Sequence, residues 1–152
     1  MAIQMVIEPD LEAKRQLVTR HSVREAQKTY HILLAEDNRV SQRLTVALLQ
    51  KKGHAVTVAE NGKQVLQILA IERFDLILMD GQMPEMDGLE TTCRIREQEK
   101  ETGAHIPIIA MTAHALNSDR ERFLEAGMDG YLSKPIRPEE LFATIEAVGR
   151  TR

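Results

Sequence analysis

The chain has 152 residues, 43% hydrophobic and 28% charged, which suits one globular domain with a tail and excludes a disordered or membrane-embedded protein. Its net charge of −3 gives no broad basic surface for nucleic acid, no apolar stretch approaches membrane-spanning length, and the N-terminus turns acidic too early for a secretory signal. The single cysteine excludes an internal disulfide and a cysteine-based zinc site, so a reducing, cytoplasmic setting is expected.

Residues 1–30 alternate charged residues and glutamine with scattered leucine and valine, and no apolar period lasts beyond a turn or two. We expect a linker with some helix. A short helix over 22–29 is predicted because Ser22 and Glu25 have the spacing of a capping box. The domain proper is expected to cover 31–150.

From His31 onward, short apolar runs alternate with segments of helical periodicity. This alternation predicts an α/β fold, a doubly wound five-stranded parallel sheet with five helices and right-handed connections. The expected order is strand 32–35, helix 40–52, strand 54–59, helix through 65–69, strand 74–79, helix 89–101, strand 107–111, helix 118–126, strand 130–132 and a helix from 138.

Polar residues follow four of these strands where each strand ends. Glu36 and Asp37 follow the first strand, Asp80 the third, Thr112 the fourth and Lys134 the fifth. Because the carboxyl ends of parallel strands share one edge of the sheet, we expect these side chains to converge. Three converging acids repel one another, and a hard cation with oxygen ligands, best supplied by Mg²⁺, relieves that repulsion.

Each of these residues also has an ordinary interpretation. The pair Glu36-Asp37 caps a helix as readily as it binds a metal, Lys134 alone is a solvated surface lysine, and Thr112 alone is a strand-end hydroxyl. Asp87 is expected only to make the Asp-Gly turn. Their joint placement at four strand ends favours one common site.

The motifs that carry these residues resemble the response-regulator receiver domain, the phosphoacceptor module of two-component signalling. The resemblance implies a flavodoxin-like sheet with strand order 2-1-3-4-5. The motifs are similar in wording to receivers of hybrid sensor histidine kinases. The stretch TRHSVRE resembles the segment that joins such a receiver to its kinase core. The matching stretches are LLAEDN at 33–38, MDGQMPEMDG at 79–88, Thr112 before Ala113, YLSKP at 131–135 and TRHSVRE at 19–25.

The resemblance implies a role for each acid. Asp80 is the expected nucleophile, accepting phosphoryl from a phosphohistidine. Asp37, the Asp80 carboxylate and the backbone carbonyl of Gln82 are the expected Mg²⁺ ligands, with Glu36 acting mainly through a bound water. In such a site the metal clamps the attacking and phosphoryl oxygens together.

The resemblance also implies a switch. Lys134 and Thr112 are expected to contact the phosphoryl oxygens, and Pro135 resembles the family's cis-proline. Tyr131 would then rotate into the space that Thr112 leaves, although a static half-buried tyrosine remains an alternative. Gly81 departs from the bulkier residue expected after the nucleophile, which predicts a looser turn or room for a partner.

The implied partners are the catalytic and dimerisation domain of a histidine kinase and, in a phosphorelay, a histidine phosphotransfer domain. Neither nucleic acid nor membrane contact by this chain is expected. The resemblance implies a parent protein of a kind that can be anchored in the inner membrane. The chain is expected to be a phosphoacceptor with at most autophosphatase activity, so its status as an enzyme stays open.

Two other functions fit parts of the pattern. A haloacid-dehalogenase-like phosphatase also forms an aspartyl phosphate, but it needs a second aspartate two places after the nucleophile at the first strand. Here Asp37 is followed by Asn38 and Arg39, so that pair is missing. A receiver-shaped docking module that works without phosphorylation is the other alternative, and it has no need of the complete acid, threonine and lysine set.

Overall fold

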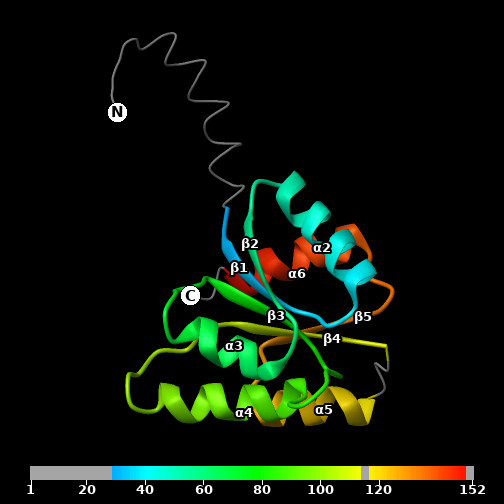
Figure 1. The fold of residues 1–152 in the computed structure, drawn as a ribbon. Coiled ribbons are helices and arrows are strands. Elements are labelled where there is room, and N and C mark those ends of the chain that lie inside the picture. The colour runs from blue at the N-terminus through cyan, green and yellow to red at the C-terminus, as the bar shows by residue number, and fades with distance from the viewer. Residues whose placement is uncertain (1–28, 114–116, 150–152) are drawn as a thin grey trace, which may run out of the picture.

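The computed structural model describes residues 29–113 and 117–149, which form one α/β domain (Figure 1). All strands are parallel and lie in the order β2-β1-β3-β4-β5, as predicted. The helix expected over 22–29 falls, apart from Thr29, outside the described residues. The elements are β1 His31–Ala35, α2 Arg39–Lys51, β2 Ala55–Ala59, α3 Gly62–Leu69, β3 Leu76–Asp80, α4 Gly88–Glu99, β4 Ile108–Thr112, α5 Asn117–Ala126, β5 Gly130–Ser133 and α6 Pro138–Gly149.

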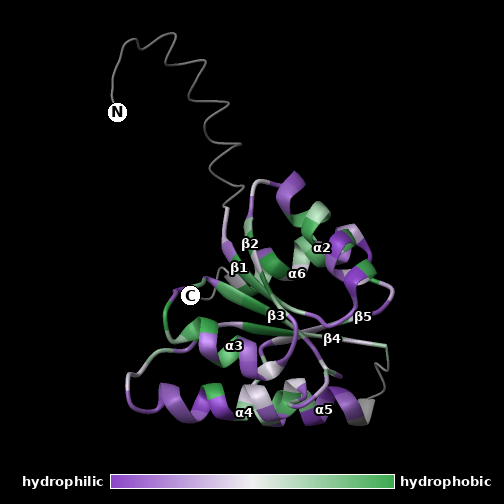
Figure 2. Ribbon diagram, in the orientation of Figure 1, coloured by the Kyte–Doolittle hydropathy of each residue, from purple (hydrophilic) through white to green (hydrophobic). Residues whose placement is uncertain are grey.

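The sheet is covered on both faces, which explains why its strands are apolar almost throughout. Along β1, Ile32 and Leu34 belong to the core beneath α2 and α6, whereas Leu33 and Ala35 belong to the core shared with α3, α4 and α5. Figure 1 shows these two helical layers above and below the sheet. In Figure 2 the hydrophobic colour concentrates in the strands, while the outward surfaces of α4 and α5 are mostly hydrophilic.

Three helices begin at a side chain that accepts a hydrogen bond from the first helical turn. Asn38, Asn61 and Asp87 precede α2, α3 and α4, and each accepts from the backbone N–H three residues later, at 2.9 Å. Asp87 therefore caps α4, which extends its predicted role in the turn. Asn38, and neither Glu36 nor Asp37, caps α2, so both acids remain available for other contacts.

The third strand is shifted relative to its prediction. It was expected over 74–79, but β3 begins at Leu76 and includes Asp80, which pairs in register with Met111 of β4. Phe74 precedes the strand and packs its ring 4.3 Å from the ring of His31. Asp80 is consequently held by the sheet itself.

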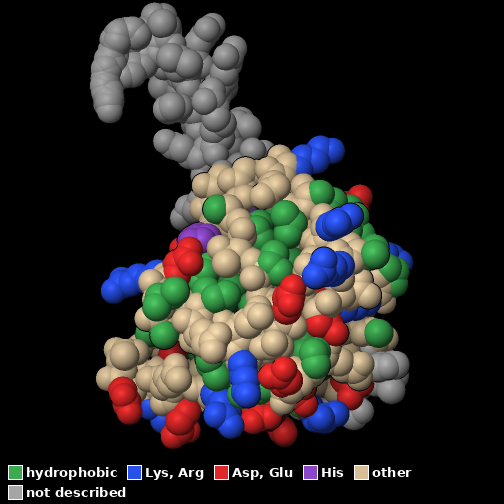
Figure 3. All heavy atoms as spheres, in the orientation of Figure 1, with side chains coloured by type: hydrophobic (Ala, Val, Ile, Leu, Met, Phe, Trp, Pro, Cys, Tyr) green, Lys and Arg blue, Asp and Glu red, His purple; other side chains and the backbone are tan. Residues whose placement is uncertain are grey.

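The surface is mixed in charge. On the face presented in Figure 3, acidic and basic side chains are interspersed along the border formed by α4. Within the described ranges, none of the helices is long and apolar enough to cross a membrane.

Candidate metal centre

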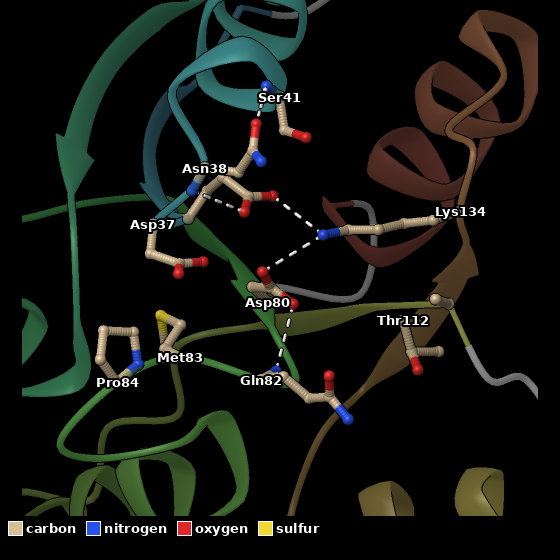
Figure 4. Close-up of a pocket in the computed structure, with 11 residues that line it drawn as sticks. Asp37, Asn38, Ser41, Asp80, Gln82, Met83, Pro84, Thr112 and Lys134 are labelled. Carbon is tan, nitrogen blue, oxygen red and sulfur yellow. Dashed lines mark hydrogen bonds and ion pairs between the residues drawn. The ribbon is translucent and has the colours of Figure 1, made fainter.

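A cavity of about 530 Å³ opens at the carboxyl edge of the sheet, where β1, β3, β4 and β5 end (Figure 4). It collects the acids, the threonine and the lysine that the sequence places at separate strand ends. The predicted convergence is therefore confirmed. The lining residues are Glu36, Asp37, Asn38, Ser41, Asp80, Gln82, Met83, Pro84, Thr112, Ala113 and Lys134.

Asp80 lies at the centre of this cavity, at the last position of β3, and is only 6% exposed. Its Oδ1 accepts a hydrogen bond of 3.1 Å from the backbone N–H of Gln82, and its Oδ2 lies 3.2 Å from Lys134 Nζ. One carboxylate oxygen is thus fixed by the following turn and the other by the lysine. The carboxylate is held in a defined orientation, facing the cavity.

Glu36 is the most deeply buried acid of the site, at 1% exposure. Its Oε1 accepts from Lys134 Nζ at 3.1 Å, and its Oε2 accepts from the backbone N–H of Asn38 at 3.2 Å. Lys134 therefore bridges two carboxylates that come from β1 and β3 (Figure 4). A buried acid is tolerated here because a cation and an N–H group both face it.

The two bridged groups have shifted protonation equilibria. Burial raises the pKa of Glu36 above its ordinary value, the neighbouring Asp80 raises it further, and Lys134 and the Asn38 N–H oppose the rise. Burial lowers the pKa of Lys134, but its contacts with Glu36 and Asp80 outweigh that effect and leave the pKa raised. Lys134 therefore carries its positive charge at neutral pH.

The remaining predicted residues have different positions. Asp37 is exposed at the mouth of the cavity, and Thr112 is buried at the end of β4, on the other side of Asp80 from Asp37 (Figure 4). Gln82 lines the cavity through the turn after Asp80. Tyr131 is half-buried on β5, with the guanidinium of Arg120 5.1 Å from its ring centre. The Lys134-Pro135 peptide bond is cis, as expected.

Asn38 lines this site and makes two hydrogen bonds in it, although no role there was predicted for it from the sequence. Its backbone N–H donates to Glu36, and its side chain caps α2 by accepting from Ser41 N–H. Three consecutive polar residues follow β1, and any of them could cap a helix. Only the helix start at Arg39, one residue after Asn38, identifies the cap.

The acids fit a divalent cation with oxygen ligands. Glu36, Asp37 and Asp80 each offer a carboxylate oxygen, and these oxygens lie within 4.8 Å of one another. Mg²⁺ favours sites with few carboxylates and open positions for water or phosphate, and the exposed side of Asp37 leaves such positions. The donor set contains oxygen alone, with no histidine or cysteine, which is the chemistry of a hard cation.

Comparison with known protein families gives a consistent result. The family described as "Response regulator receiver domain" matches residues 32–146. The chain is 50% identical over 119 residues to hybrid signal transduction histidine kinase I of Dictyostelium discoideum and 40% identical over 115 residues to the sensor histidine kinase GacS of Pseudomonas protegens. Each alignment covers 75% of this chain but only 7% and 12% of those proteins, so the chain corresponds to a small part of each.

Solved structures agree with these matches. The receiver domain of sensor histidine kinase PA1611 from Pseudomonas aeruginosa, described with a magnesium ion coordinated in its active site cleft, is 41% identical with a TM-score of 0.73. The structural alignment covers 81% of this chain and 99% of the PA1611 receiver domain. The receiver domain of Ssk1 from Saccharomyces cerevisiae, solved with the histidine phosphotransfer protein Ypd1, is 30% identical with a TM-score of 0.77, covering 81% and 90%.

Proposed function

The chain belongs to the response regulator receiver domain family, and from this membership we propose that Asp80 accepts a phosphoryl group from a phosphohistidine. The observation that carries the proposal is the arrangement around Asp80. Three carboxylates lie within 4.8 Å of one another, and Lys134 Nζ bridges Glu36 and Asp80. A site of this kind neutralises incoming phosphoryl charge while it presents one carboxylate oxygen to phosphorus.

The residues divide the work of the transfer. Asp37, Asp80 and the Gln82 carbonyl would hold Mg²⁺, with Glu36 beside them. The bound ion supplies positive charge to the attacking and phosphoryl oxygens. An Asp80 carboxylate oxygen forms a bond to phosphorus while the phosphorus–nitrogen bond to histidine breaks, and the imidazole nitrogen leaves with the bonding electron pair. The chain contributes position and electrostatics to this transfer.

Lys134 and Thr112 respond to the new group. Phosphorylation adds about −1.5 to −2 charges, which draws the ammonium of Lys134 and the hydroxyl of Thr112 toward the phosphoryl oxygens. Both residues lie at neighbouring strand ends, where Lys134 N–H donates to the Thr112 carbonyl at 2.7 Å. Movement at one therefore reaches the other. Thr112 pairs with Ser133 of β5, and Tyr131 lies two residues earlier on the same strand. We propose that the Tyr131 side chain rotates into the space that Thr112 leaves.

The direct test is incubation of the purified chain with acetyl phosphate and Mg²⁺, followed by intact-mass and peptide mass spectrometry. Asp80→Asn is expected to abolish labelling, and Asp37→Asn to reduce it strongly. Asp87→Asn, in the same loop, is the matched control, because asparagine can still cap α4 and labelling should persist. Labelling of the Asp80→Asn variant at the wild-type level would contradict the assignment. Sustained turnover of p-nitrophenyl phosphate would instead support the phosphatase alternative.

A partner surface lies next to the site. We propose that the chain is the receiver of a hybrid histidine kinase, joined through residues 1–30, and that a histidine phosphotransfer domain docks on α2. Val40 and Leu44 are one helical turn apart on α2, and their exposed fractions are 76% and 56%. Both follow closely after Asn38, which lines the cavity. An apolar helix face beside the nucleophile suits a helical partner that must bring a histidine to Asp80.

Substitutions on this surface separate docking from chemistry. Val40→Ser with Leu44→Ser is expected to weaken transfer to and from a phosphotransfer domain while leaving labelling by acetyl phosphate unchanged. Ile71→Ser, at an apolar residue beyond α3 that is 84% exposed, is the control. Unchanged transfer in the double variant would exclude this surface as the docking site.

A further inference from the structure

Gly81, the residue directly after Asp80, has no conformational need to be glycine. The glycines with positive φ in the described residues are Gly53, Gly103 and Gly127, so the backbone at Gly81 is one that a side chain tolerates. A Cβ atom built at Gly81 would lie 3.4 Å from Cζ and 3.6 Å from Cε1 of the Phe123 ring, which is ordinary van der Waals contact. A methyl group therefore fits at this position, whereas a longer side chain directed the same way would meet the ring. The room that the sequence predicts at Gly81 is therefore filled by a side chain of α5.

Phe123 comes from the middle of α5, and its ring is only 8% exposed. It belongs to the core beneath α3, α4 and α5, which includes Met79 and Ala110 from the two central strands. The ring therefore reaches from α5 to the tip of the sheet. It packs where a larger residue at position 81 would otherwise place its own side chain.

The backbone of Gly81 is attached to the two segments that form the site. Its N–H donates to the carbonyl of Met111 at 3.0 Å, and Met111 immediately precedes Thr112. Its carbonyl accepts from Gly88 N–H at 3.3 Å, at the start of α4. A shift of Asp80 or of the end of β4 consequently changes the surface against which the Phe123 ring rests.

We propose that Phe123 is a positioning residue that couples the Asp80 turn to α5, through its contact with Gly81. This inference rests on the proposed function, because the displacement that it transmits begins with a phosphoryl group on Asp80. The same helix carries Arg120 one turn earlier, over the ring of Tyr131. The side of α5 that holds Phe123 and Arg120 thus contacts the turn after β3 and the side chain of Tyr131 within β5. Because these groups are closely packed, a displacement of the Asp80 turn is expected to displace α5 as well.

The packing half of the proposal is tested on the unmodified protein. Gly81→Leu should lower the urea midpoint because its side chain overlaps the Phe123 ring, and Phe123→Ala should lower it by opening a cavity. The double variant should have a higher midpoint than the sum of the two losses predicts, because the new leucine fills the space left by the ring. Additive losses would show that the two positions do not share a space and would overturn the proposal.

The coupling half uses beryllofluoride with Mg²⁺, a mimic of a phosphoryl group on a carboxylate, and backbone amide NMR shifts. In wild type, binding should shift amides of α5. Phe123→Leu, which keeps the core apolar, should bind the mimic within about threefold of wild type but show less than half of the α5 response. Leu124→Ala, at the adjacent and 47% exposed residue, is the control and should retain the response.

The outcomes separate the two claims. A full α5 response in Phe123→Leu would overturn the coupling while leaving Asp80 as the phosphoacceptor. A wild-type chain that fails to bind beryllofluoride, and that acetyl phosphate fails to label, would overturn the proposed function itself.

Discussion

Lys134 Nζ lies 3.2 Å from Asp80 Oδ2, so the proposed nucleophile already has a cation beside it before any metal or phosphoryl group arrives. The same nitrogen is 3.1 Å from Glu36 Oε1. The ammonium group of Lys134 therefore neutralises part of the negative charge that would attract a divalent ion. Two cations that share one set of carboxylates compete, since each weakens the attraction felt by the other.

We expect Lys134→Gln to bind Mg²⁺ more tightly than wild type, by about tenfold or ~1.4 kcal/mol, although it should lose the response to phosphorylation. Isothermal titration calorimetry measures the affinity. Lys63→Gln is the control, because Lys63 is exposed and lies 3.9 Å from Glu85, outside the cavity. Weaker Mg²⁺ binding in Lys134→Gln would mean that the lysine orders the carboxylates more than it competes with the metal.

The junction between the N-terminal segment and β1 should be sensitive to pH. Tyr30 N–H donates to His54 Nδ1 at 3.0 Å, and the two rings stack with centres 5.5 Å apart. This bond requires an unprotonated Nδ1. Burial lowers the pKa of His54 below its ordinary 6.5, Glu146 partly offsets the effect, and Lys52 adds to it.

The sign follows from proton linkage. Below pH 6.5 the unfolded chain protonates His54 while the folded chain resists, so the free energy of unfolding should fall as pH decreases toward the lowered pKa. Above 6.5 both states are neutral and His54 contributes no slope. Urea unfolding across this range measures the effect, and His54→Asn, which retains an acceptor but does not titrate, should flatten it. An equal slope in that variant would assign the pH dependence to other groups.

The sequence predicts the sheet well because its three inner strands, β1, β3 and β4, are buried almost throughout and read as apolar runs. In a parallel sheet the residues that follow the strands all lie at one edge. Glu36, Asp37, Asp80 and Lys134 could therefore be assigned to one site from the sequence alone. Boundaries were less accurate, since whether Asp80 ends β3 or follows it depends on pairing with Met111 in another strand.

Contacts between distant residues are the part that sequence patterns do not reveal. Gly81 stands out in the sequence as a small residue in an unusual place, but two explanations were open. Nothing local indicates that Phe123, 42 positions later, fills the space. Likewise, the periodicity of α2 marks Val40 and Leu44 as apolar positions, whereas the structure leaves both exposed. Side-chain packing and exposure are determined by the assembled layers.

Gly88 should be intolerant of even one methyl group. A Cβ atom there would lie 2.5 Å from the backbone carbonyl oxygen of Asp80. This oxygen belongs to the backbone, so it cannot move aside as the end of a flexible side chain could. Alanine normally favours a helix over glycine by about 1 kcal/mol, so the overlap must outweigh that gain. We expect Gly88→Ala to lower the free energy of unfolding by about 1–3 kcal/mol and to weaken Mg²⁺ binding by displacing Asp80.

Urea denaturation and calorimetric Mg²⁺ titration measure the two effects. Gly130→Ala is the matched control, because the nearest atom to its added Cβ is 3.5 Å away, an ordinary contact. That variant should keep wild-type Mg²⁺ affinity. Tight Mg²⁺ binding by Gly88→Ala would mean that the turn relaxes without moving the carboxylate.

Two adjacent threonines on α4 should respond in opposite directions to the same substitution. Thr91 and Thr92 are both fully buried. Thr91 Oγ1 donates to the carbonyl of Asp87 at 2.7 Å, whereas Thr92 Oγ1 has no hydrogen-bond partner among the described residues. Valine has nearly the shape of threonine, so the exchange mainly removes the hydroxyl group.

Thr92→Val should raise the free energy of unfolding by ~1 kcal/mol, because it removes a buried polar group that is desolvated without compensation. Thr91→Val should lower it by about the same amount, because the Asp87 carbonyl loses its hydroxyl donor. Urea unfolding of both variants decides the matter. If Thr92→Val were destabilising, its hydroxyl would have to be satisfied in solution, for example by a bound water, and the core beneath α4 would be less dry than its packing indicates.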